Sequence, residues 1–174
     1  MGFEVFWNRY YPGLLVYFRN SFPLSREDAE DMVQETLFKV YRNRASYNGE
    51  TAFSTWVYTI GRNTCIDFLR QARNRYDAAE PVSKEPAPGA EEFPDARPGP
   101  ETLALRKEEG REIREAILDI LSPADREILF LRMYKEMPYR EISAMTGKPV
   151  GTIKYRFFEI RNLLKKRLGA DHGT

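Results

Sequence analysis

The sequence predicts an all-α protein with two small helical domains, joined by a flexible acidic Pro-rich linker, the second domain being a helix-turn-helix. Apolar residues recur at three- and four-residue spacing in both halves of the 174-residue chain, and no segment shows the sustained alternation of a strand. Residues 77–100 contain six prolines in 24 positions. Residues 148–167 hold seven Lys or Arg and one Glu, although the net charge of the whole chain is only +1.

The first domain, residues 1–76, is expected to contain three helices. Apolar side chains at helical spacing predict an amphipathic helix over residues 2–20 and a second one over 26–44. Ser25 precedes the second helix, with Asp28 three residues later, which is a capping-box pattern. The segment "YNGE" predicts a turn at 47–50. The following stretch, from residue 51 to about 75, predicts one long helix, or two with a bend near Gly61.

The linker, residues 77–100, has little that could be buried. Pro-rich acidic segments stay extended and solvated, so 24 residues could span roughly 75 Å at ~3.1 Å each. The segment is either a passive tether between the two domains or an acidic segment that keeps the basic modules from binding the wrong nucleic acid.

The second domain, residues 101–174, is expected to consist of shorter helices. "SPAD" at 122–125 predicts a helix start, with Ser122 as the cap and Pro123 in the first turn. "PYREISAMTG" predicts a short helix that ends at Gly147, and Pro149 opens a last helix to about residue 168. Two helices joined by the tight "TGKP" turn are typical of a helix-turn-helix.

Charge and composition narrow the function classes. Residues 1–76 carry a net charge of +2, residues 77–110 of −5 and residues 111–174 of +4, which favours two nucleic-acid-facing modules. One Cys and one His predict neither a disulfide nor a Cys/His metal site, and no cofactor is expected. Neither a Gly-rich phosphate loop nor a nucleophile beside a base is found, so the chain is not expected to be an enzyme. The absence of an apolar run near ~20 residues and of a signal peptide predicts a cytoplasmic protein without membrane insertion.

The last helix has the composition of a major-groove reader. One face is apolar and would pack on the domain, while the other offers cations for phosphates and mixed side chains for base edges. This second face carries Thr152, Lys154, Tyr155, Arg156, Glu159 and Arg161. The alternative reading is the solvated charged face of an ordinary helix.

The third helix of the first domain interleaves aromatic residues with cations, a composition that suits single-stranded nucleic acid because unstacked bases meet ring faces. An amide such as Asn63 can read a base edge exposed by strand opening. The residues concerned are Phe53, Trp56, Tyr58, Arg62, Asn63, Arg70, Arg73 and Arg75. Phe53 and Trp56 could equally be structural, because aromatic residues at helical spacing are usually core.

The second helix carries Asp31, Gln34 and Glu35 away from its apolar stripe. These residues are either ordinary solvated surface or a polar, acidic docking face for a protein partner.

Three motifs together resemble the extracytoplasmic-function (ECF) sigma factors of bacteria. They are "DAEDMVQETLFKVYRN", "FSTWVYTIGRNTCIDFLRQARN" and "LSPADREILFLRMYKEMPYREISAMTGKPVGTIKYRFFEIRNLLKKRL", and the resemblance covers both modules, about 130 of 174 residues. It implies a factor that binds core RNA polymerase and directs it to promoter DNA, with an anti-sigma factor as a further partner. The linker would thread toward the active-site cleft and the RNA exit path of the polymerase.

The resemblance also assigns roles to residues. Asp31, Gln34 and Glu35 would dock sigma region 2 on the clamp helices of the largest polymerase subunit. Region 2 would also melt the minus-ten element, with Tyr47 and Asn63 forming a pocket for a flipped non-template base and Phe53, Trp56 and Arg62 along the strand path. Region 4 would read the minus-thirty-five duplex through Lys154, Tyr155, Arg156, Phe158 and Glu159. Tyr155 stands where the family usually has a small residue, and Glu159 where it often has a basic one, so a relative's promoter sequence is not carried over.

Two other functions remain open at this point. One is a one-component regulator that binds duplex DNA without polymerase, with the first domain as a sensor or dimer module. The other is an adaptor or anti-sigma-like decoy that binds polymerase but does not open DNA.

Overall fold

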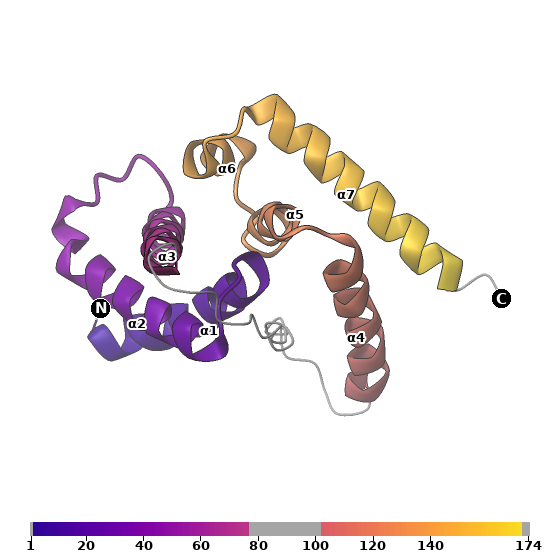
Figure 1. The fold of residues 1–174 in the computed structure, drawn as a ribbon, viewed down its shortest axis with the longest axis horizontal. Helices are drawn as coiled ribbons and strands as arrows, with labels where there is room; N and C mark the ends of the chain where they lie inside the picture. Colours follow the sequence, from indigo (N-terminus) through magenta and orange to yellow (C-terminus); the bar gives the residue numbers. More distant parts are fainter. Residues whose placement is uncertain (1, 77–101, 172–174) are drawn as a thin grey trace. The chain divides into compact units, whose positions relative to one another are not determined.

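The computed structural model describes residues 2–76 and 102–171, with side chains over 2–75 and 110–169. The chain separates into two compact units, Met1–Glu91 and Glu92–Thr174. All regular elements in the described ranges are helical, as the sequence predicts (Figure 1). The predicted linker, residues 77–100, and His172 lie outside the described residues.

The first unit is a three-helix arrangement of α1 (Phe3–Ser21), α2 (Arg26–Arg42) and α3 (Phe53–Tyr76). Helix α2 packs against both α1 and α3. Its cap is the predicted one, because the Asp28 N–H donates to Ser25 Oγ at 3.0 Å and the Ser25 hydroxyl donates to Asp28 Oδ2 at 2.8 Å. The predicted second helix is two residues too long: α2 ends at Arg42, and a 3₁₀ turn, Arg44–Ser46, follows.

The core of the first unit lies between these helices. Tyr17, Phe18 and Leu14 of α1 are fully buried, and Val33 and Leu37 of α2 lie in the same core. Tyr58, one of the aromatic residues whose pattern suits single-stranded nucleic acid, is also fully buried. Cys65 is buried, as expected for a small core residue.

Helix α3 is one continuous helix, which is the first of the two arrangements that the sequence predicted. The reason for glycine at position 61 is close packing. A Cβ on Gly61 would lie 2.9 Å from Phe18 Cζ and 3.2 Å from Leu14 Cδ2, and both of those side chains are fully buried. Gly61 therefore lets α1 approach α3 closely.

The second unit consists of α4 (Thr102–Ile120), α5 (Pro123–Leu129), a π-helical turn (Phe130–Tyr134), α6 (Tyr139–Thr146) and α7 (Val150–Asp171). Helix α7 contacts α4, α5 and α6, and so it holds this unit together. Its buried residues are Ile153, Phe157 and Ile160, which the sequence placed on the packing face.

The π-helical turn was not predicted. The apolar run after Ser122 continues beyond Leu129 as a π turn, and Met133 in that turn is 63% exposed. Burial lowers the pKa of the nearby Arg126 guanidinium. Arg126 Nη2 donates to the Leu118 carbonyl at 2.8 Å, which ties α5 to the end of α4.

Within the described ranges, no helix is both long and apolar enough to cross a membrane.

Substitution of Gly61 by Ala is expected to destabilise the first unit by about 1–3 kcal/mol, because the new methyl group overpacks a closed core. Helix propensity alone predicts the opposite sign, a gain of about 1 kcal/mol. Urea unfolding followed by tryptophan fluorescence measures the effect, since both tryptophans, Trp7 and Trp56, lie in this unit.

The matched control is Gly110→Ala in α4, where an added Cβ meets nothing within 4 Å. This change should leave the stability of the second unit unchanged or raise it, as followed by circular dichroism during unfolding. A stabilised Gly61→Ala protein would contradict the close-packing argument.

Candidate nucleic-acid interface

The exposed face of α2 carries the three residues predicted to dock a protein partner. Asp31, Gln34 and Glu35 are all solvent-exposed and lie opposite the buried stripe. Glu35 forms an ion pair with Lys39 at 2.6 Å, and Lys39 Nζ also lies 3.3 Å from Thr64 Oγ1 of α3. The lysine therefore orients one acid of this face, while Asp31 and Gln34 point to solvent.

An aromatic patch borders this acidic face. Phe38, one turn after Glu35, is 58% exposed, and its ring stacks on Phe3 with centroids 5.7 Å apart. Trp7 meets Phe38 edge-on at 6.0 Å. Large exposed apolar surface next to charged residues is typical of protein contact sites. Phe38 was not predicted as a site residue, although the adjacent Leu37 occupies the buried stripe and so directs Phe38 outward.

Three residues predicted to meet single-stranded DNA form one aromatic cluster. The Tyr47 ring lies 5.1 Å from Phe53 and 5.4 Å from Trp56, and the last two rings are 5.6 Å apart. All three are half-buried. The Tyr47 hydroxyl donates a hydrogen bond to the Thr51 carbonyl, which fixes the loop before α3. The three rings therefore pack against the core with one part of their surface and expose the rest to solvent.

The cluster rests on buried rings of α1. Phe53 meets Tyr10 edge-on at 6.1 Å and Phe6 at 6.5 Å. Burial raises the pKa of the Tyr10 phenol, which the charge of Arg9 only partly offsets, so Tyr10 is neutral at physiological pH. This support holds the exposed rings in one orientation.

Polar and basic residues continue from the cluster along α3. Trp56, Asn63 and Arg70 recur every seven residues and so share one face of the helix. Asn63 and Arg70 are exposed, and Arg70 lies 3.7 Å from Asp67. A neighbouring strip, rotated by about 80–100° around the helix axis from this face, carries Arg62 and Arg73. Arg62 is half-buried and Arg73 is exposed. Trp56, Asn63 and Arg70 therefore share one strip of this helix, and Arg62 and Arg73 share an adjacent one, whereas the predicted Tyr58 is buried in the core.

The third candidate surface is the outward face of α7. Tyr155 and Phe158 are 61% and 60% exposed, opposite the packing face, which is unusual for large aromatic side chains. The other residues predicted on this face are exposed or half-buried. Those exposed are Thr152, Lys154, Arg156 and Arg161, and Glu159 is half-buried.

The turn that precedes α7 has the geometry of a helix-turn-helix. Gly147 ends α6 in the left-handed region at φ 73°, and its N–H donates to the Ser143 carbonyl at 2.9 Å. The Ser143 hydroxyl donates to the Lys148 carbonyl at 2.6 Å. The Ile153 N–H then donates to the Pro149 carbonyl at 3.0 Å, so α7 begins immediately after the predicted proline.

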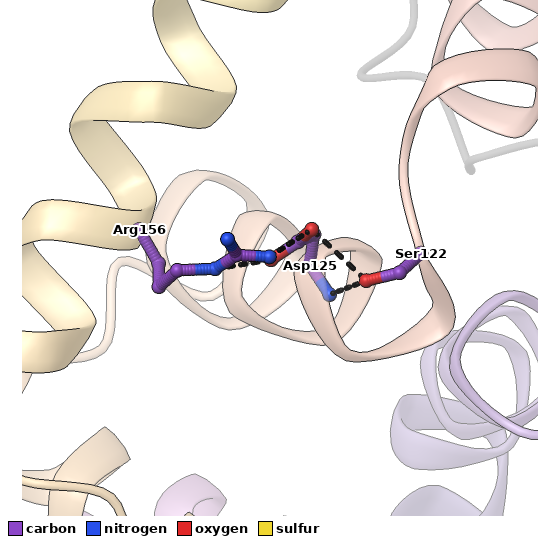
Figure 2. Close-up of polar contacts among 3 residues, drawn as sticks. All are labelled: Ser122, Asp125 and Arg156. Atoms are coloured by element: carbon purple, nitrogen blue, oxygen red, sulfur yellow. Dashed lines mark hydrogen bonds and ion pairs between the residues drawn. The ribbon is translucent and has the colours of Figure 1, made fainter.

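Arg156 differs from its neighbours because its guanidinium is already bonded within the unit. Figure 2 shows it reaching Asp125 of α5, with Nε 3.0 Å and Nη2 2.7 Å from Oδ1. The Asp125 side chain is only 10% exposed, whereas that of Arg156 is 45% exposed. Asp125 was predicted only as a helix-start residue, since nothing local in the sequence indicates a partner on another helix.

Among the residues with described side chains, no group of three or more His, Cys, Asp or Glu is arranged to hold a metal ion.

All three candidate surfaces fall within matched family models. Residues 6–75 match the model of Sigma-70 region 2, and residues 111–164 match that of Sigma-70, region 4. An ECF RNA polymerase sigma-E factor of Haemophilus influenzae is 32% identical over 148 residues, which cover 83% of this chain and 77% of that protein. The protein of the same name from Escherichia coli K12 is 33% identical over 146 residues, covering 81% and 74%.

Solved structures show the same fold. The sigma factor RpoE, in complex with the anti-sigma factor NepR from Bartonella quintana, has a TM-score of 0.62 and 26% identity, with 97% of this chain and 98% of that chain covered. CnrH, in complex with the cytosolic domain of CnrY, has a TM-score of 0.58 and 20% identity, with coverages of 97% and 88%.

Tyr47→Phe is expected to lower the stability of the first unit by about 0.5–1.5 kcal/mol, because it removes the hydrogen bond to Thr51 while keeping the ring contacts. Urea unfolding followed by tryptophan fluorescence gives the value. The control is Tyr41→Phe in the same unit, a half-buried tyrosine that should change stability by less than about 0.5 kcal/mol. Equal effects of the two substitutions would contradict a stabilising role for the Tyr47 hydroxyl.

Proposed function

The chain belongs to the ECF RNA polymerase sigma factors of the sigma-70 family, and we propose which surfaces carry out each step of promoter recognition. It is an alternative sigma factor, which binds core RNA polymerase and directs transcription initiation. In the proposal, residues 1–76 act as region 2 and residues 101–174 as region 4, with 77–100 as the linker. The chemistry of RNA synthesis stays with the polymerase, and the factor acts with it in the cytoplasm.

The proposed polymerase contact is the outward face of α2. Asp31, Gln34 and Glu35 would meet the clamp helices, as the family implies for these positions. Their exposure on a helix held from two sides by α1 and α3 supports this role, because a rigid face loses little entropy on binding. Phe38 would add an apolar anchor beside the acids.

The proposed minus-ten surface runs from the aromatic cluster along α3. Tyr47, Phe53 and Trp56 would stack on bases of the melted non-template strand, with Asn63 hydrogen-bonded to a flipped base. Arg62, Arg70 and Arg73 would follow the phosphates. The mutual ring contacts of 5.1–5.6 Å support this role, since they hold ring faces ready at the surface.

The proposed minus-thirty-five reader is α7. Thr152, Lys154, Tyr155 and Phe158 would enter the major groove, and Arg161 would contact phosphate. Glu159 could accept a hydrogen bond from cytosine N4. The exposed aromatic pair supports an apolar contact with DNA, because neither ring is needed for the core.

We further propose that an anti-sigma factor holds the free protein inactive. The Bartonella quintana relative, which covers nearly the whole chain at 26% identity, was solved with such a partner. Exposed aromatic residues on both units, Phe38 and Phe158 among them, offer surface for a protein to cover.

The observation that carries the proposal is that the acidic face, the aromatic cluster and the basic reading helix are three separate exposed surfaces. Each surface has the chemistry of the partner assigned to it. An ordinary duplex-binding regulator would need only the last of them.

The combined variant Asp31→Ala, Gln34→Ala and Glu35→Ala is expected to weaken binding to sigma-free core polymerase by at least about tenfold, because it removes the polar face. Run-off transcription with a library of genomic fragments is the first measurement. The wild type should give discrete transcripts, and the variant should give few or none at limiting protein.

The control for this variant is Glu4→Ala with Glu50→Ala, which also removes two exposed negative charges from the first unit but leaves α2 intact. Equal transcription by all three proteins would refute docking through α2. If the wild type gives no transcript but shifts a specific duplex alone, the protein works as a one-component regulator. If it binds core polymerase without opening a promoter, it works as a decoy.

Trp56→Ala is expected to weaken binding of the polymerase complex to single-stranded non-template oligonucleotide by about 1–3 kcal/mol, since one base loses its stacking partner. Trp56→Phe keeps a ring and should retain most of the affinity. Fluorescence anisotropy with a labelled oligonucleotide measures both, and the melting temperature of each variant shows whether folding is affected. If a folded Trp56→Ala protein bound the oligonucleotide as tightly as the wild type, Trp56 would not be part of the DNA-binding surface.

A further inference from the structure

The ion pair between Arg156 and Asp125 occupies one edge of the guanidinium and leaves the adjacent edge open. Arg156 Nε donates to Oδ1 at 3.0 Å, and Nη2 lies 2.7 Å from both Oδ1 and Oδ2. Because the carboxylate lies on the Nε side of Nη2, the second Nη2 hydrogen points away from it, beside a hydrogen of Nη1. Among the residues with described side chains, Nη1 has no hydrogen-bond partner. A second edge with two parallel donors therefore remains.

The carboxylate that supports Arg156 is itself held in place from its own helix. The Ser122 hydroxyl donates to Asp125 Oδ2 at 2.9 Å, and the Asp125 N–H donates to Ser122 Oγ at 3.2 Å (Figure 2). Pro123 follows the cap in the first turn of α5 and limits backbone motion there. With its side chain 10% exposed, Asp125 has little room to turn away, so it is a fixed support for the guanidinium.

The open edge belongs to a side chain on the outward face of α7. The Arg156 side chain is 45% exposed although its other edge meets the nearly buried Asp125. Thr152, one turn earlier on the helix, and the adjacent Tyr155 are exposed as well. The supported arginine thus lies among the residues that the proposed function assigns to duplex DNA.

Asp125 also changes which DNA group suits this edge. The carboxylate offsets the positive charge of Arg156 and weakens its attraction to phosphate, whereas the geometry of the two parallel donors is kept. In the major groove, guanine is the base whose edge presents two adjacent acceptors, O6 and N7. Arg161 is exposed and forms no ion pair with any described side chain, so it keeps its full charge for a phosphate.

We propose that Asp125 is a positioning residue, which holds Arg156 so that its Nη1 and Nη2 donors read one guanine of the upstream duplex. The ion pair orders the guanidinium before DNA arrives, so less side-chain entropy is lost when it bonds to the base. Asp125 then contributes to sequence specificity without touching DNA. This inference rests on the proposed reading of the minus-thirty-five duplex by α7.

The test compares binding of the polymerase complex to promoter duplexes that differ at single atoms. Selection from a library randomised in the upstream element identifies the positions at which the wild type prefers guanine. Each such guanine is then replaced by 7-deazaguanine, which still pairs with cytosine but lacks the N7 acceptor. Asp125→Asn keeps the side-chain shape and an acceptor for Ser122, while it removes the charge and one acceptor for Arg156. Asp125→Asn/Arg156→Ala leaves no unpaired charge at this position.

If the proposal is right, the wild type prefers guanine about fivefold or more at one position, and loss of N7 there weakens binding about threefold or more. Asp125→Asn lowers this preference by about two- to tenfold, because an unsupported arginine must be ordered on binding. Asp125→Asn/Arg156→Ala removes both the preference and the N7 effect. Arg161→Ala, the matched control, weakens binding to all duplexes alike and keeps the N7 effect.

Ser122→Ala separates positioning from simple stabilisation. It removes the cap hydroxyl and lowers the melting temperature, but it leaves both partners of the ion pair in place, so most of the guanine preference should remain. An unchanged guanine preference in Asp125→Asn would overturn the proposal. So would an equal loss in Ser122→Ala, or an N7 effect at every preferred guanine that persists without Arg156. Absence of any promoter-specific binding by the wild-type polymerase complex would instead refute the proposed function.

Discussion

The requirement that α2 and α7 each bury a single stripe governs the exposed surfaces of this structure. Small helical units have little interior, so their stability depends on burying the apolar face of such helices fully. In α2 this stripe faces both α1 and α3, and its buried residues are Ala29, Met32, Val33, Thr36, Leu37 and Val40. The opposite face is thereby left exposed. In α7 the same division buries Ile153, Phe157 and Ile160 and exposes the basic and aromatic side.

Polar side chains inside these stripes are tolerated because they bond to their own helix. The Thr36 hydroxyl donates to the Met32 carbonyl at 2.6 Å, and the Thr64 hydroxyl donates to the Ile60 carbonyl at 2.9 Å. Such bonds avoid the cost of an unpaired buried hydroxyl. The helices can therefore pack closely, and glycine at position 61 brings α1 and α3 closer still.

The aromatic residues link the core to the proposed binding surfaces. Tyr47, Phe53 and Trp56 are half-buried, and Phe53 rests on the buried ring of Tyr10. A ring fixed in this way keeps its orientation before a partner arrives, which reduces the entropy lost on binding. The same packing explains why a structural and a functional interpretation of Phe53 and Trp56 are compatible.

Local patterns in the sequence determined the helices, their caps and the two faces of α2 and α7. These follow from residue spacing and from short-range hydrogen bonds, as at Ser25 and Gly147, which do not depend on distant contacts. The same residue spacing also predicted that Asp31, Lys154 and Tyr155 point outward. Identification of the chemistry at each surface needed the resemblance of the motifs, because spacing alone left other functions open.

Tertiary structure decided the features that depend on partners far away in the chain. Ser25/Asp28 and Ser122/Asp125 carry the same capping pattern, yet Asp28 lies near solvent while Asp125 is buried against Arg156, 31 positions away. The close approach of α1 to α3 at Gly61 is of the same kind. Local propensity cannot predict these features, because the contacts form only when α1 meets α3 or when α5 meets α7.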